Sequence, residues 1–333
     1  MTNNAIILTL AYPETVVRIS DEWFLKYLHL IGVGKKNFVR AGHAALVLIH
    51  KETGHLEYFD FGRYISPLST GRVRSKATDH ELDFPLEPII KDGNIENLEE
   101  ILIFLATHPE LTHGSGTMYA SVCDAVNFES VKTFASSMQE RHFIRYAVFA
   151  KKATNCARFV TDALIAGVTN PTIKKRLVKS KWFTPSTVGN VVFADTRDKV
   201  YQVSEDGKVG VFKSSARKLN RTLFLDRLKN HQPNLNGNLE PQHNPVKHEK
   251  AHWLPGIGSG AWFELYNLNR DLEYRFRRVS PYGNIDVDGV YKLLGRGFDI
   301  QSDYNFTHYS NCKHFHVKQN GKIFRFEFLR HHS

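Results

Sequence analysis

Apolar residues in the first part of the chain occur in short unbroken runs, which are typical of strands buried in a core. Residues 5–10 (AIILTL) form one such run, and residues 42–49 (GHAALVLI) form a second. After a turn at residues 51–54, the chain continues with the apolar stretch 56–61 (LEYFDF). Two such runs around a short turn that contains glycine predict a β-hairpin inside a core.

Other segments have the spacing of amphipathic helices. In residues 94–107 and 155–167 the apolar side chains recur every three or four positions, and a glycine ends the second segment. Residues 128–139 follow Asn127, which is a good N-cap residue. Residues 20–28 begin with Ser-Asp-Glu and continue with apolar residues at helical spacing. We expect a helix in each of these segments.

Polar stretches divide the remainder of the chain. Residues 65–85 are interrupted by prolines and a glycine, so we expect a long loop there. A hairpin is predicted over residues 191–213, and residues 214–252 are predicted to be a polar linker. Residues 253–333 alternate apolar and polar positions between glycine and proline turns, which predicts a small β-rich module. Residues 1–190 then form one domain, an antiparallel sheet packed on helices, and the fold class is α+β.

Composition narrows the class of protein. A chain of 333 residues that is 42% hydrophobic and 23% charged is globular, which excludes fibrous and largely disordered proteins. No apolar run approaches the ~18–20 residues that a membrane helix needs. The first residues lack the basic region of a secretory signal, and the three cysteines form no C-x-x-C pair. These features predict a cytoplasmic protein with free thiols.

The net charge of +10 is unevenly distributed along the chain. From residue 214 onward there are 18 Lys and Arg against 11 Asp and Glu. A basic half is compatible with an anionic partner, but no helix-turn-helix, zinc finger or RNP-like motif accompanies the charge. We therefore do not expect nucleic acid to be the partner.

Cys156 is the strongest candidate for chemistry. It lies at the start of the helix predicted over residues 155–167, where the helix dipole and unpaired N–H groups favour a thiolate. The same N–H groups can stabilise an oxyanion. A buried structural cysteine is the alternative interpretation. A thiolate nucleophile needs an imidazole, and His43 at the start of a buried strand needs a partner.

The imidazole in turn needs a polar group that orients it. Tyr58 and Asp60 lie two positions apart on the return strand and so share one of its faces. Asp60, between two phenylalanines, is the preferred candidate; Tyr58 is second and His55 is weaker.

Three segments together carry a resemblance to a known superfamily: residues 42–49, residues 58–64 (YFDFGRY) and residues 155–160 (NCARFV). They resemble the circularly permuted papain-like fold of lecithin:retinol acyltransferase-like proteins, YiiX-type hydrolases and permuted relatives of NlpC-type peptidases. The chain also resembles an uncharacterised bacterial family that adds a Gly-Arg-Val-Arg loop at residues 71–74 and a Thr-Asp-His turn at residues 78–80. The resemblance covers roughly residues 1–190.

The resemblance implies roles for individual residues. Cys156 is the nucleophile, His43 is the base and acid, and the second-strand residue orients the imidazole. The sequence departs from the acyltransferase pattern because it has no clear histidine at that second-strand position, where Tyr58 and Asp60 are the candidates.

Charged residues in the loop expected over residues 65–85 are candidates for substrate binding. Arg72, Arg74, Asp79 and His80 follow the second strand and can line a cleft, because arginine recognises carboxylate and phosphate groups. Ordinary ion pairs in a surface loop are an equally good interpretation.

A competing site lies near the C-terminal end of the chain. Cys312, His314 and His316 alternate along one strand, and with His308 they could hold zinc. Histidines on a half-exposed strand are the simpler interpretation, and no Walker or dinucleotide motif is present. We therefore expect neither a metal nor a cofactor.

The chemistry that these residues predict is thiolate attack on an acyl carbon. The protein is then a cysteine hydrolase or acyltransferase that cleaves an amide or ester bond through a thioester, with a small molecule, peptide or lipid as substrate. The alternative is a non-catalytic peptide- or lipid-binding protein that uses the same cleft, while the basic C-terminal module binds an anionic partner. The oligomeric state is not predicted.

Overall fold

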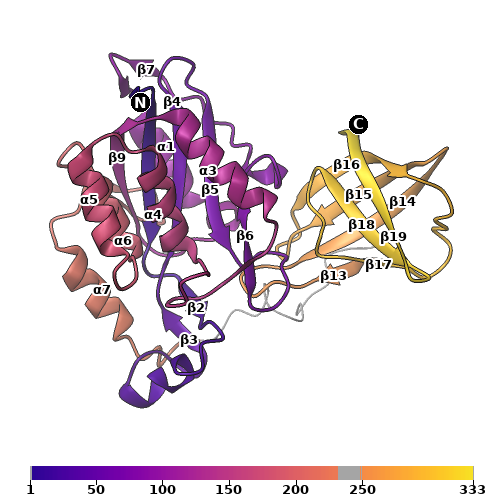
Figure 1. The fold of residues 1–333 in the computed structure, drawn as a ribbon, viewed down its shortest axis with the longest axis horizontal. Coiled ribbons are helices and arrows are strands. Elements are labelled where there is room, and N and C mark those ends of the chain that lie inside the picture. The colour runs from indigo at the N-terminus through magenta and orange to yellow at the C-terminus, as the bar shows by residue number, and fades with distance from the viewer. Residues whose placement is uncertain (1, 232–247, 249, 333) are drawn as a thin grey trace. The chain divides into compact units, whose positions relative to one another are not determined.

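A computed structural model describes residues 2–231, 248 and 250–332 (Figure 1). The chain separates into two compact units. Unit 1 comprises Met1–Gly62 and Phe84–Pro233, and unit 2 comprises Arg63–Asp83 and Asn234–Ser333. The sequence boundaries differ from this division, because the predicted domain over residues 1–190 includes the segment Arg63–Asp83 that belongs to unit 2. Part of the predicted linker, residues 232–247 and 249, lies outside the described residues.

Unit 1 is built on a largely antiparallel sheet. Its strands follow in the order β5 (Leu56–Gly62), β4 (His43–His50), β1 (Ala5–Tyr12), β9 (Met118–Val126), β11 (Tyr201–Val203) and β12 (Val209–Val211). Every residue of β1 is buried, and so is every residue of β4 except the last. A strand covered on both faces has an apolar run rather than an alternating pattern. The predicted strands and the β4–β5 hairpin are therefore confirmed.

Helices cover this sheet and connect its strands. They are α1 (Leu98–Thr107), α2 (Pro109–Thr112), α3 (Phe128–Glu140), α4 (Cys156–Gly167), α5 (Pro171–Ser180), α6 (Thr187–Ala194) and α7 (Ala216–Phe224). Helix α4 packs against α3, β4 and β5, as Figure 1 shows. The predicted helices over 94–107, 128–139 and 155–167 are present, except that the first begins later because Asn94–Ile95 form the short strand β8 with β7 (Ile90–Lys91).

Smaller elements complete unit 1. Strands β2 (Val16–Arg18) and β3 (Phe38–Arg40) pair with each other, and β10 covers Ile144–Arg145. The helix predicted over residues 20–28 is a 3₁₀ helix, η1 (Leu25–Ile31), which ends at Gly32 in the left-handed conformation. None of the helices in the described part of the chain has the length and apolarity required to span a bilayer.

Unit 2 contains a seven-stranded antiparallel sheet. Its strands follow in the order β13 (His252–Leu254), β14 (Ala261–Arg270), β15 (Glu273–Val279), β16 (Ile285–Leu294), β19 (Lys322–His331), β18 (His314–Gln319) and β17 (Asn305–Phe306). Stacked aromatic rings form its core; Phe276 and Phe315 lie 4.4 Å apart between centroids, and Phe315 and Phe326 lie 4.5 Å apart. The β-rich C-terminal module expected from the alternating pattern is present, and the protein has a mixed α+β fold.

Three stretches differ from the sequence prediction. The hairpin predicted over residues 191–213 is shorter and consists of β11 and β12, because residues 191–194 are the last turn of α6. Residues 65–85 are not a featureless loop: they contain β6 (Thr70–Arg74) and the 3₁₀ turn η2 (His80–Leu82), and most of β6 is buried. Helix α7 falls within the segment predicted as linker. The errors over residues 65–85 and in the linker have the same cause, because polar and basic residues predict a solvent-exposed loop. In residues 65–85 such residues form buried ion pairs, and in α7 they form one face of a helix.

Candidate functional site

Cys156 is the first residue of α4, and its neighbour Asn155 caps the helix. The Asn155 side-chain oxygen accepts a hydrogen bond from the Arg158 N–H at 3.0 Å, and its amide donates to the Ala147 carbonyl at 3.1 Å. The first N–H groups of a helix have no partner within the helix. Those of Cys156 and Ala157 therefore lie beside the sulfur, where they can stabilise an oxyanion.

His43 begins β4 directly after a glycine that the backbone requires. Gly42 has φ +78°, and a Cβ there would lie 2.8 Å from the Cα of Pro13. The Gly42 carbonyl lies 3.9 Å from the Cys156 sulfur and can accept its hydrogen bond. This close approach of β4 to the start of α4 brings the imidazole and the thiol together across more than a hundred residues of chain.

Asp60 holds the other side of the imidazole. Its Oδ2 lies 3.3 Å from His43 Nε2, and Tyr58 donates a hydrogen bond to the same oxygen at 3.1 Å. The Asp60 side chain is fully buried. The structure thus places Asp60 in direct contact with the imidazole and Tyr58 behind it, whereas His55 pairs with Glu57 at 3.1 Å.

The electrostatics of His43 follow from these contacts. Burial by itself lowers the pKa of the imidazole, but hydrogen bonds to Asp60 and to Cys156 outweigh burial and raise the pKa to about 9. Because Nε2 faces Asp60, Nδ1 is the nitrogen left for the thiol. A charged imidazole beside a thiol stabilises the thiolate, so the pair is arranged for nucleophilic attack.

Cys156 lines a cavity of about 800 Å³ that lies entirely within unit 1. Most of its lining is apolar and comes from η1, residues 146–149, the segment before α6 and the end of α7. Its apolar lining residues include Val39, Val148, Phe149, Phe183, Leu223 and Phe224. The sequence did not predict this cavity, because the aromatic residues around residue 23 have the spacing of an amphipathic helix and their exposure is evident only in the structure.

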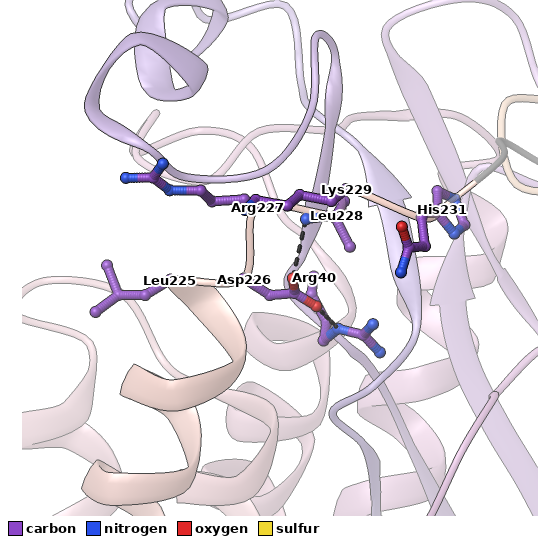
Figure 2. A pocket seen from close by; sticks show the side chains of 8 residues that line it. Arg40, Leu225, Asp226, Arg227, Leu228, Lys229 and His231 are labelled. Carbon is purple, nitrogen blue, oxygen red and sulfur yellow. Dashed lines mark hydrogen bonds and ion pairs between the residues drawn. The ribbon is translucent and has the colours of Figure 1, made fainter.

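A second cavity of about 690 Å³ shares Arg40 and Leu225 with the first. Figure 2 shows the Arg40–Asp226 ion pair (2.9 Å) with the side chains of Arg227, Lys229 and His231 around it. Burial lowers the pKa of His231, and the positive charges of Arg40 and Lys35 lower it further. The charged residues that line the cavity are Arg40, Arg227 and Lys229 against Asp226 alone, so the cavity is electropositive.

The four residues expected to bind substrate lie in unit 2 and pair mainly with one another or with neighbours in that unit. Arg72 makes two hydrogen bonds to Asp79, at 2.6 and 2.7 Å, and Arg278 makes a third at 3.1 Å. Arg74 is buried and its guanidinium lies 4.1 Å from the centre of the Tyr64 ring. Burial raises the pKa of Asp79, but Arg72 and Arg278 hold it well below its usual range.

His80 belongs to the same segment and is half-buried, with its ring 5.4 Å from that of Phe328. These contacts are those of a structural ion network in unit 2, rather than of groups that line the cavity at Cys156.

The competing cysteine is inaccessible. Cys312 is fully buried in unit 2, and burial raises the pKa of its thiol to about 12. His308 bonds the Pro255 carbonyl at 3.0 Å, and the rings of His314 and His316 lie 5.4 Å apart. Within the described residues, no three His, Cys, Asp or Glu side chains are arranged to hold a metal ion.

The site and fold together define a mixed α+β protein with a Cys–His–Asp arrangement at a helix N-terminus. The chain belongs to the type VI secretion system effector TseH-like family, whose model matches residues 7–173. Residues 251–329 match a second family model, the DUF6695 C-terminal domain.

A similar solved structure is the crystal structure of the type VI secretion system effector TseH. It shares 18% sequence identity with this chain, and the match covers 64% of this chain and 100% of that one with a TM-score of 0.41. No match was found among curated proteins.

Proposed function

We propose that this protein is a cysteine-dependent hydrolase or acyltransferase that cleaves an amide or ester bond through a thioester on Cys156. The observation that carries the proposal is the position of His43, which hydrogen bonds to Asp60 on one side and to Cys156 on the other. The order of a histidine on β4, an aspartate on β5 and a cysteine opening α4 also supports a circularly permuted papain-like fold for unit 1.

The reaction proceeds in two steps. The Cys156 thiolate attacks the acyl carbon, the N-terminal N–H groups of α4 stabilise the oxyanion, and the His43 imidazolium protonates the leaving group. Water or another acceptor then attacks the thioester while His43 removes its proton. Asp60 keeps the imidazole oriented and stabilises its charge throughout.

Family membership bears on the location of the protein. Because the chain belongs to an effector family of a secretion system, we infer that this system delivers it to a recipient cell. The cytoplasmic location expected from the sequence stays a prediction. The substrate is then a component of that cell.

Thiol alkylation tests the proposal directly. Iodoacetamide should label Cys156 rapidly at neutral pH, and His43→Gln should remove this reactivity. Cys123 and Cys312 are internal controls, because burial raises the pKa of each thiol to about 12 and both should remain unlabelled. A Cys156 that reacts no faster than free cysteine, with or without His43, contradicts the proposal.

The large apolar cavity supports a second candidate function, a non-catalytic protein that binds a peptide or lipid beside Cys156. In that case Cys156→Ala should bind its ligand as well as the native protein does, and no acyl group should appear on the native cysteine. Detection of a covalent acyl-protein in the native chain by intact mass spectrometry excludes this alternative.

A further inference from the structure

We propose that the substrate is a fatty acyl ester of a membrane lipid, whose acyl chain lies in the cavity beside Cys156 while aromatic residues at the cavity insert into the bilayer interface. The inference rests on the proposed function for its chemistry. It adds the class of substrate and the surface on which the enzyme works.

The first observation is the match between the cavity and an alkyl chain. The cavity of about 800 Å³ is lined mostly by aliphatic and aromatic side chains from several separate segments of unit 1, and Cys156 is in its wall. A polar peptide or glycan would leave its hydrogen-bonding groups unpaired against such a lining, which costs free energy. An alkyl chain gains about 0.8 kcal/mol, or about fourfold in affinity, for each methylene that leaves water.

The second observation is a connected group of aromatic rings, here called the aromatic rim: Trp23, Phe24, Tyr27, Phe149 and Phe183. Neighbouring centroids are 6.4 Å apart for Tyr27–Trp23, 5.9 Å for Trp23–Phe24, 5.6 Å for Phe24–Phe149 and 5.1 Å for Phe149–Phe183. Three of its members line the cavity.

The aromatic rim is also accessible to a membrane. Trp23 is 72% exposed and Phe183 is 74% exposed, and the adjacent Leu30, Ile31 and Trp182 are exposed as well. Large apolar side chains grouped in this way mark an interaction surface. Trp and Tyr favour the headgroup level of a bilayer, where an apolar ring and a polar edge are both satisfied.

The third observation is the positive charge beside the aromatic rim, which favours an anionic bilayer as the partner of this surface. Helix α7 carries Arg217, Lys218 and Arg221, contains no acidic residue and has no buried residue, while Leu223 and Phe224 line the cavity. The neighbouring electropositive cavity adds Arg227 and Lys229 (Figure 2). A basic face next to apolar side chains is the pattern of elements that lie in the interface of anionic membranes.

The chemical step balances without a further reactant except water. The Cys156 thiolate forms a C–S bond to the ester carbonyl carbon, the C–O bond breaks, and the alkoxide of the lysolipid takes the proton from the His43 imidazolium. Water then adds to the thioester, His43 takes its proton, the C–S bond breaks and a free fatty acid leaves. One ester and one water give one fatty acid and one lysolipid.

Membrane docking is tested with the full chain carrying Cys156→Ala, so that no turnover occurs. It should sediment with vesicles of phosphatidylethanolamine and phosphatidylglycerol and much less with vesicles of phosphatidylcholine alone. Trp23→Ser and Phe183→Ser should each weaken binding about tenfold. Ile89→Ser is the matched control, because Ile89 is 53% exposed in unit 1 but does not line the cavity. Equal binding of all variants overturns the proposal.

The substrate class is tested with the native chain on acyl esters of increasing chain length and on the same anionic vesicles. Fatty acid and lysolipid should be released from the vesicles. For the soluble esters, kcat/KM should rise by up to about fourfold for each added methylene. Ala41→Trp should abolish this rise for long chains, because the larger side chain narrows the cavity. Folding of that variant is checked by its unchanged iodoacetamide labelling of Cys156.

The outcomes separate the two proposals. The lipid proposal is overturned if Cys156 cleaves short esters with no preference for long chains, or if it cleaves peptide amides but not the lipids of the vesicles. Either result leaves the proposed thioester chemistry intact. Absence of any Cys156-dependent cleavage, together with an unreactive thiol, overturns the proposed function and the lipid substrate together.

Discussion

Replacing Asp60 by asparagine tests the electrostatic design of the site, because it removes one charge and keeps the shape of the side chain. In the native protein burial disfavours the charged imidazole, yet hydrogen bonds to Asp60 and Cys156 raise the pKa of His43 from 6.5 to about 9. This rise corresponds to about 3 kcal/mol in favour of the charged form. In Asp60→Asn the burial remains while the carboxylate is gone and only Cys156 still favours the charged imidazole, so the pKa of His43 should fall well below its native value.

The pKa rise also makes folding stability depend on pH, with a defined sign. The pKa of His43 is higher in the folded protein than in the unfolded chain, so protonation of His43 stabilises the folded state. This contribution to the free energy of unfolding is complete below about pH 6.5 and disappears as the pH rises through about 9. The native protein should lose about 3 kcal/mol of unfolding free energy from this group across that interval. Asp60→Asn should show little of this loss.

An NMR titration of the His43 ring measures the pKa directly, with the resonance assigned by its absence in His43→Gln. Glu57→Gln is the matched control, because Glu57 lies on the same strand, is buried and pairs with His55 and Lys132 rather than with His43. The alkaline limit of kcat/KM should move with the measured pKa. An unchanged His43 pKa in Asp60→Asn would refute the assignment of Asp60 as the orienting group.

Three further predictions concern the supports of the site and unit 2. Asn155→Ala should cost about 1 kcal/mol of unfolding free energy by loss of the helix cap and slow alkylation of the adjacent thiol, and Asn155→Ser should restore both. Gly42→Ala should lower kcat and stability because it combines a positive φ with a Cβ contact of 2.8 Å, whereas Gly93→Ala, with φ +74° and open space, should leave kcat unchanged. Arg278→Ala should destabilise unit 2 by about 3–5 kcal/mol in denaturation by urea, because it removes the buried partner of Glu81 and Asp286 while Asp79 keeps only Arg72. It should not slow alkylation in unit 1, and equal effects on both units would contradict this division.

Much of the secondary structure could be predicted because it depends on short-range patterns. The apolar runs in β1 and β4 identified buried strands, and the asparagines before α3 and α4 marked where those helices begin. The segment 65–85 could not be predicted in this way. Its arginines and Asp79 are polar in sequence, but in the folded protein Arg72 pairs with Asp79, which also pairs with Arg278, some two hundred residues away.

The same distinction applies to the site. The sequence by itself determined which residues have suitable chemistry: a cysteine at a helix N-terminus, a histidine opening a buried strand and an aspartate between two phenylalanines. Only the tertiary structure decided that Asp60 rather than His55 faces His43, that Arg72 lies in unit 2, and that η1 and α7 enclose a cavity at Cys156. The physical reason is the distance along the sequence over which each interaction acts. Helical periodicity and capping act over a few residues, whereas cavities and buried ion pairs form only where packing brings distant segments into contact.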